Sequence, residues 1–168
     1  FLGEILGLGP AQFFWFFVIS IAGIMAGAFL SGRMAGRVKA TRQIRYGFIV
    51  MAAVSAINLA LNALFVANAW WALVPIGLYA FGWAMMVPVV TLLVLDLVPE
   101  RRGMASSLQA FVGSSANGLV AGLIAPLVMH SALALAATSL GMLSIGMVSW
   151  LWVKPHLRAA APLPAVAV

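Results

Sequence analysis

The feature of this sequence that most constrains its fold is a series of apolar stretches long enough to cross a lipid bilayer. A membrane-spanning helix needs about 20 mainly apolar residues. Five stretches meet this requirement, at residues 11–30, 47–69, 70–95, 103–129 and 132–153. Only a weak break divides the second from the third, but one helix over both would be far longer than a bilayer is thick. We therefore predict an all-α integral membrane protein with five transmembrane helices.

The composition excludes a water-soluble domain. Of the 168 residues, 65% are hydrophobic and only 7% are charged, whereas a soluble domain of this size needs a charged surface. The net charge of +6 does not indicate nucleic-acid binding, because the basic residues fall in short clusters between the apolar stretches. Since the chain has no cysteine, it has neither a disulfide nor a thiolate metal site.

The basic clusters predict how the helices are oriented. Lys and Arg accumulate in the cytoplasmic loops of membrane proteins. Alternating the five stretches places all nine basic residues on one side: Arg33, Arg37, Lys39, Arg42, Arg45, Arg101, Arg102, Lys154 and Arg158. We expect that side to be the cytoplasm. Residues 1–10 then form an extracytoplasmic lead-in, and residues 154–168 form a cytoplasmic tail that we expect to be disordered.

The chain begins at Phe1 without an initiator methionine, and no signal peptide is visible. We therefore expect this sequence to be a fragment of a longer protein.

Small residues spaced by four predict which helices pack closely, because membrane helices associate through close contact rather than hydrophobic burial. The first stretch carries Gly23, Gly27 and Ser31 in this spacing. The fourth carries a longer set, made of Gly103, Ser107, Ser114, Gly118 and Gly122. We expect these faces to pack against other helices. The alternative, functional interpretation is that the packed faces slide past each other during transport.

The third stretch carries a face of aromatic residues and methionine. Every third or fourth residue belongs to it, in the series Trp71, Pro75, Tyr79, Trp83 and Met86. Such a wall makes dispersion and cation-π contacts with many ligands without demanding one hydrogen-bond geometry. Two interpretations stay open, a ligand-binding wall and ordinary packing against lipid or neighbouring helices.

Two of the prolines inside the predicted spans, Pro88 and Pro126, favour a functional interpretation. Pro88 removes the backbone hydrogen bond to the carbonyl of Ala84, and Pro126 removes the bond to the carbonyl of Gly122. We expect a kink and a free acceptor at each position. Kinked helices with free carbonyls are typical of cavity-lining or moving walls, although kinks also occur in static helices.

Polar residues inside the spans are few. Ser55, Asn58 and Asn62 share a face of the second stretch, and Gln109 and Asn117 lie on the fourth. Hydrogen bonding between helices is the expected role of the asparagines, and Gln109 is the better candidate for lining a cavity. Because no ionisable residue lies in the middle of a span, neither a proton relay, a metal site nor a cofactor is predicted here.

Two loop segments resemble those of a known transporter family. The segment SGRMAGRVKATR at residues 31–42 resembles the second-half loop motif of the major facilitator superfamily. Pro88 with VPERRGMASSLQ at residues 98–109, and LGPAQF at residues 8–13, resemble the Bcr/CflA group of drug-resistance transporters. We take the loop motif to include Gly32, Arg33, Arg37 and Arg101. This chain departs from the family at Gly36, where an aspartate is usual, and at Lys39, where a glycine is common. Asp96 and Glu100 are candidates to face Arg33 or Arg37 instead, and solvated loop charges without such a pair are the alternative, because exposed ion pairs are usually weak.

The resemblance implies that the five helices are helices eight to twelve of a twelve-helix transporter, a partial C-terminal six-helix bundle. The partners then expected are the N-terminal half and helix seven, a small-molecule substrate and the lipid bilayer. The resemblance also implies alternating access, with helices seven and ten lining the cavity, eight and eleven facing the other half, and nine and twelve outside. The location implied is the bacterial inner membrane.

The leading functional hypothesis is a proton-driven exporter of small amphipathic or cationic compounds, including antibiotics. Its binding wall is predicted to include Tyr79, Trp83, Met86 and Gln109. A structural or assembly subunit is the alternative, favoured by the glycine faces. An intramembrane enzyme is opposed by the sequence, because His130 and His156 are predicted to lie at opposite membrane faces.

Overall fold

The computed structural model describes residues 13–64 and 69–159, and all of its regular structure is helical. Three long helices come first: α1 (Phe13–Met34), α2 (Ala40–Leu64) and α3 (Ala69–Leu97). A short η2 turn (Pro99–Arg101) leads into α4 (Arg102–Leu119), η3 (Val120–Ile124), α5 (Ala125–Val128) and finally α6 (Ala132–Ala159). Five of the resulting helical spans are long and apolar enough to cross a membrane, which confirms the predicted fold class. The predicted lead-in at residues 1–10 lies outside the described residues.

Several helices extend beyond the apolar stretches from which they were predicted, and α2 and α6 extend furthest. α2 begins at Ala40 rather than at residue 47, so Arg42 and Arg45 belong to the helix and not to the loop. α6 continues to Ala159, so the expectation of a disordered tail was wrong for residues 154–159. A helix gains one backbone hydrogen bond for each residue added, and long basic side chains at its end can reach water. Residues 160–168 lie outside the described part.

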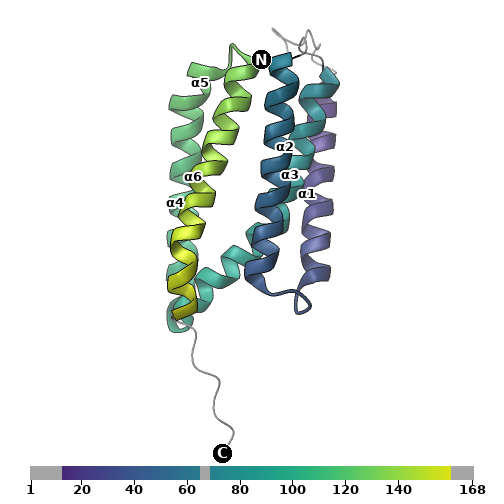
Figure 1. The fold of residues 1–168 in the computed structure, drawn as a ribbon. Helices are drawn as coiled ribbons and strands as arrows, with labels where there is room; N and C mark the ends of the chain where they lie inside the picture. Colours follow the sequence, from purple (N-terminus) through teal and green to yellow (C-terminus); the bar gives the residue numbers. More distant parts are fainter. Residues whose placement is uncertain (1–12, 65–68, 160–168) are drawn as a thin grey trace, which may run out of the picture.

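The first three helices pack side by side (Figure 1), with α3 against both α1 and α2. Glycines allow α1 and α3 to approach closely. A methyl group on Gly23 would collide with the carbonyl of Gly77, and one on Gly27 would collide with the carbonyl of Phe81. Gly47 of α2 has the same role, because a methyl group there would lie 2.9 Å from the carbonyl oxygen of Gly82. Backbones therefore meet directly at these contacts, as small residues permit between membrane helices.

The last helix, α6, joins the bundle through α2 rather than α3. A buried apolar cluster forms at this contact from Ile44, Phe48, Met51 and Leu143. Because α6 and α3 both pack against α2, the space between α6 and α3 is backed by α2.

The fourth span is not one regular helix. Between α4 and α5 the chain makes a π turn at η3, where the N–H of Ala125 donates to the carbonyl of Val120, five residues earlier. Pro126 comes directly after this turn and has no N–H to donate. π turns of this kind occur as local insertions in α-helices, often at functional sites. The predicted irregularity at Pro126 therefore takes the form of a widened turn.

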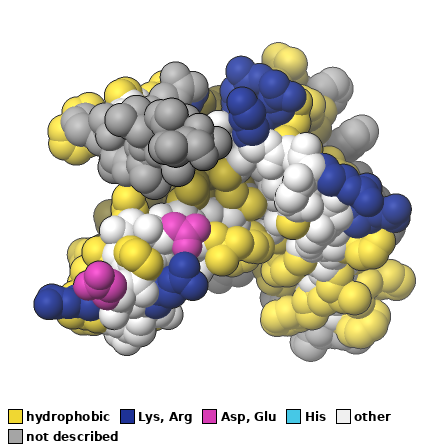
Figure 2. All heavy atoms as spheres, turned by 90° about the horizontal axis from the view of Figure 1, so that it is seen from below, with side chains coloured by type: hydrophobic (Ala, Val, Ile, Leu, Met, Phe, Trp, Pro, Cys, Tyr) yellow, Lys and Arg dark blue, Asp and Glu magenta, His cyan; other side chains and the backbone are white. Residues whose placement is uncertain are grey.

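The α1–α2 connection, the η2 turn and the end of α6 lie at the same end of the bundle, shown at the bottom of Figure 1. Figure 2 views this end directly and shows Lys and Arg side chains around it, with acidic side chains near some of them. We call it the basic end. The clustering follows from the alternation of the spans.

Gly36 forms the turn after α1 at the basic end. Its φ is +73°, the only positive φ among the described residues, and a side chain is strained in that conformation. The N–H of Val38 closes the turn by donating to the carbonyl of Met34. Glycine at this position therefore suits the conformation of the turn.

Candidate functional site

Two cavities lie between α3 and α6, with α2 behind them. The first, which we call the polar cavity, has a volume of about 220 Å³. It is lined by Val54, Ser55, Asn58, Pro75, Ile76, Tyr79 and Ser139. The second, which we call the apolar cavity, has a volume of about 300 Å³ and lies nearer the basic end. Its walls include Phe48, Met86, Leu93 and Trp150.

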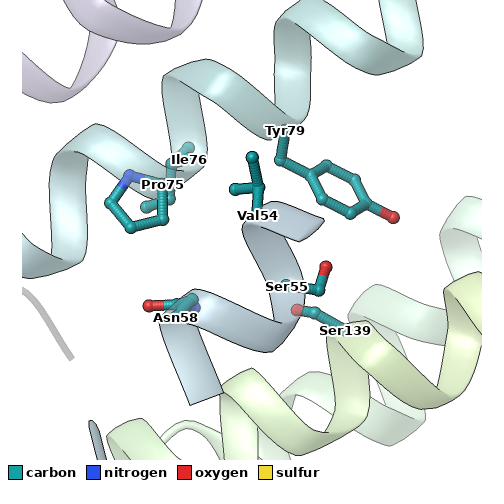
Figure 3. Close-up of a pocket in the computed structure, with 7 residues that line it drawn as sticks. All are labelled: Val54, Ser55, Asn58, Pro75, Ile76, Tyr79 and Ser139. Atoms are coloured by element: carbon teal, nitrogen blue, oxygen red, sulfur yellow. The ribbon is translucent and has the colours of Figure 1, made fainter. Parts of the chain in front are cut away.

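The polar cavity combines hydroxyl and amide groups from three helices, as Figure 3 shows. Ser55 of α2 is only 3% exposed, and its Oγ has no hydrogen-bond partner. The Ser139 hydroxyl donates to the carbonyl of Leu135 in its own helix, and Oδ1 of Asn58 accepts from Asn62. One buried hydroxyl is thus left unpaired beside a space that can hold a partner for it.

The apolar cavity has almost no polar lining. Its one hydroxyl residue is Ser149, and that hydroxyl donates to the carbonyl of Ile145 in its own helix. The two cavities therefore differ in chemistry, although the same three helices line both. A ligand in the apolar cavity would be held by dispersion contacts and by removal of apolar surface from lipid or water.

The structure places three residues of the predicted binding wall along one side of α3. Tyr79 lines the polar cavity and Met86 lines the apolar cavity. Trp83 lies four residues after Tyr79 and three before Met86, so it occupies the same helix side, and its side chain is 47% exposed. Pro75 also lines the polar cavity, whereas the side chain of Trp71 lies outside the described part. The three residues share a side of α3 but not a single cavity.

Gln109, the fourth predicted wall residue, lies apart from the other three. Its amide Nε2 donates to Oγ1 of Thr91 over 3.0 Å, which ties α4 to α3. Its Oε1 is buried and has no hydrogen-bond partner. Gln109 lines neither the polar nor the apolar cavity.

Sequence reasoning missed Gln43, which joins three helices. This side chain is 2% exposed. Its amide Nε2 donates to Oγ of Ser31 on α1 over 2.8 Å and to the carbonyl of Met85 on α3 over 3.0 Å. The missed signal was periodicity: counting back in steps of four from Ser55 gives Met51, Gly47 and Gln43, which lie on one face of α2. Placing the start of the helix at residue 47 hid that pattern.

The proline and glycine positions fall into two groups. Gly23 and Gly27 lie in the contact between α1 and α3, whereas a methyl group on Gly118 or Gly122 would meet no packing neighbour within 4 Å. Pro88 lies inside α3 without ending it, and beyond it the last turns of α3 lean toward α4 (Figure 1). Pro126 follows the π turn. The small-residue face of α4 is therefore without a partner among the described residues.

The acidic residues at the basic end, Asp96 and Glu100, were candidates to face Arg33 or Arg37, and they do not pair with them. Asp96 bonds Arg102, six residues later, over 3.0 Å, and both side chains are about 60% exposed. Arg33 instead lies over the ring of Phe29, 5.6 Å from its centroid. Within the described ranges Asp96 and Glu100 make no ion pair with Arg33 or Arg37, because the η2 turn brings Arg102 closer to Asp96. The other loop-motif residues, Gly32, Arg37 and Arg101, are exposed.

Together these features define a helical, multi-pass membrane protein. Its spans pack through glycines, its charges gather at one end, and it has uncharged cavities between helices. Among the described residues no three His, Cys, Asp or Glu side chains gather in a way that could hold a metal ion.

Comparison with models of known protein families assigns the chain to a family. The family model of the Major Facilitator Superfamily matches residues 1–121, and the chain therefore belongs to this superfamily of membrane transporters. Searches among curated proteins and among solved structures found no match.

Proposed function

We propose that this chain is part of a secondary active transporter that exports small amphipathic molecules by alternating access. The observation that carries this proposal is the uncharged side of α3, on which Tyr79 lines the polar cavity, Met86 lines the apolar cavity, and Trp83 lies on the same helix side between them. Aromatic rings and a flexible thioether adapt to varied apolar ligands. Membership of the Major Facilitator Superfamily supports transport of small molecules.

The finer parts of the proposal depend on the resemblance to the Bcr/CflA group. They are antibiotic export, antiport driven by protons, and a location in the bacterial inner membrane with the basic end in the cytoplasm. The segment at residues 98–109 supports the group assignment, and the basic end supports the orientation. Among the described residues no carboxylate lies in the middle of a span, so the proton-coupling group belongs to another part of the transporter.

We further propose that α4 packs against other helices of the same transporter. Ala105 is the only buried residue in α4, and Gly118 and Gly122 are open to close approach. Small residues on an exposed helix face are typical of helix–helix contacts in membranes. The resemblance supplies the identity of the partners, which are helix seven and the N-terminal half.

The exposed α4 face also favours the alternative function, a structural subunit that only assembles with partners. Thermal unfolding of the full-length protein with and without candidate substrates separates the two functions. A transporter is stabilised by a compound that binds its folded state. A structural subunit shows no such shift with any compound of the panel.

The transport proposal is tested in vesicles that contain the full-length protein. We expect fluorescent amphipathic compounds to move only when a pH gradient is applied. Trp83→Ala and Tyr79→Ala should lower that rate about tenfold, since each removes a large aromatic contact surface of the proposed wall. The matched control is Trp15→Ala, which removes a similarly exposed tryptophan from α1, a helix that lines neither cavity.

Each outcome decides a separate part of the proposal. Unchanged transport in both wall variants would mean that these α3 residues only pack against lipid or neighbouring helices. Equal loss in Trp15→Ala would show a general effect of removing tryptophan. If no compound of the panel moves, the export proposal fails.

A further inference from the structure

The polar cavity contains a buried group for which the fold provides no partner. Ser55 Oγ is buried and unpaired near the middle of α2. At membrane depth, water is scarce, and an unpaired polar group costs free energy. Other serines of the described spans, among them Ser139 and Ser144, avoid this cost by bonding to a carbonyl one turn earlier. The Ser55 hydroxyl is free to bond to something inside the cavity.

The cavity is large enough for a small organic molecule. A cavity of about 150 Å³ accepts benzene, and the polar cavity measures about 220 Å³. A single ring with a short polar arm therefore fits. Val54, Pro75 and Ile76 offer apolar wall for the ring, and the Tyr79 side chain extends its polar end along the same space (Figure 3).

The lining also limits the charge of the occupant. No Lys, Arg, Asp, Glu or His is among the residues that line the cavity. Transfer of an ion into such surroundings is expensive without a counter-charge. A neutral molecule with a hydroxyl group meets no such barrier and pairs with Ser55.

The way in lies on the side of the bundle. Ser139, on the second turn of α6, is exposed and belongs to the cavity wall. It lies inside a span long and apolar enough to cross the membrane. A molecule dissolved in the bilayer can therefore reach the cavity between α3 and α6 without passing through water.

We propose that the polar cavity is a binding site for a small neutral alcohol or phenol that enters from the bilayer and hydrogen-bonds to Ser55. The ring lies against Val54, Pro75 and Ile76, and the hydroxyl group lies between Ser55 and Tyr79. The site does not depend on the transport proposal, because its occupancy is an equilibrium property that needs no gradient and no movement across the membrane.

The test uses the full-length protein in nanodiscs of zwitterionic lipid and ¹⁹F NMR of three probes of similar size. The probes are 4-fluorobenzyl alcohol, 4-fluorotoluene and the 4-fluorobenzylammonium ion. Binding above partition into protein-free nanodiscs is measured at equilibrium. We expect saturable binding of the alcohol, about fivefold weaker binding of the toluene, and none of the cation. Fivefold is the effect of one net hydrogen bond.

Two variants locate the bound alcohol. Ser55→Ala should weaken its binding about fivefold, whereas Ser144→Ala, which removes a hydroxyl on α6 outside the cavity, should leave it unchanged. Ser139→Phe fills the cavity from its exposed rim and should abolish binding, so the site stays testable even if the buried Ser55 variant folds poorly.

The proposal is overturned if no probe binds saturably, which would mean that the cavity holds lipid or water alone. It is also overturned if the toluene or the cation binds as tightly as the alcohol, or if the alcohol still binds to Ser139→Phe. Because the transport assay uses different compounds and a gradient, either proposal can fail while the other stands.

Discussion

At the scale of single residues, buried amides and hydroxyls decide how the first three helices are held in register. Gln43 bonds to a hydroxyl on α1 and a carbonyl on α3, so one side chain joins three helices. Ser31 has two roles, because it continues the small-residue series of α1 and accepts one of the Gln43 bonds. Hydrogen bonds between membrane helices contribute about 0.6 kcal/mol each on average. The two Gln43 bonds therefore stabilise the fold only modestly, but they require the three helices to meet in one arrangement.

Gln43→Met keeps the side-chain volume and removes both hydrogen bonds. We expect the free energy of unfolding in bicelles to fall by about 1–2 kcal/mol, because two bonds are lost and the Ser31 hydroxyl is left buried. Ser31→Ala should cost less, and the double variant should cost less than the sum of the two. Additive costs in this double-mutant cycle would show that the two side chains are not coupled in the membrane.

At the scale of elements, the two sets of glycines predicted as packing faces have different surroundings. Those of α1 lie against the backbone of α3, whereas those of α4 have open space around them. The same spacing in the sequence thus corresponds to one contact within the described chain and one face without a partner. Spacing indicates that a helix can approach another closely, but not which helix it meets.

Gly23→Ala and Gly118→Ala form a matched pair of substitutions. Gly23→Ala places a methyl group into the carbonyl of Gly77, so we expect it to lower the thermal unfolding temperature by several degrees as α1 is pushed from α3. Gly118→Ala meets no packing neighbour and gains helix propensity of up to about 1 kcal/mol, so the unfolding temperature of this chain should hold or rise. Unfolding of the purified 168-residue chain followed by circular dichroism measures both. An equal effect of the two substitutions would contradict the packing difference.

At the scale of the whole molecule, the alternation of five spans brings all the connections that contain Lys or Arg to one end. Figure 2 shows these side chains around that end, while the turn between α5 and α6 lies at the other. Basic connections are retained in the cytoplasm. The sidedness is therefore a property of the whole chain and not of any one loop.

The absence of cysteine from the sequence makes that sidedness easy to measure. We expect a membrane-impermeant maleimide to label Ser131→Cys in intact cells, and to label Arg37→Cys only after the membrane is permeabilised. The parent sequence without cysteine is the control for background labelling. The opposite pattern of labelling would place the basic end outside the cell and overturn the proposed orientation.

The sequence by itself determined the class of protein, the helical fold with its five spans and the gathering of basic residues, because hydrophobic length and charge position act locally along the chain. It also indicated the wall of α3, since Tyr79, Trp83 and Met86 lie on one helix side by periodicity alone. Only the tertiary structure decided that Tyr79 and Met86 border two different cavities, that Gln109 bonds to Thr91 instead of joining them, and that Asp96 pairs with Arg102. It also revealed Gln43 and the unpaired Ser55. Such contacts depend on which helices meet and on how far one helix is shifted along the other. The packing of segments that are distant in the sequence determines both.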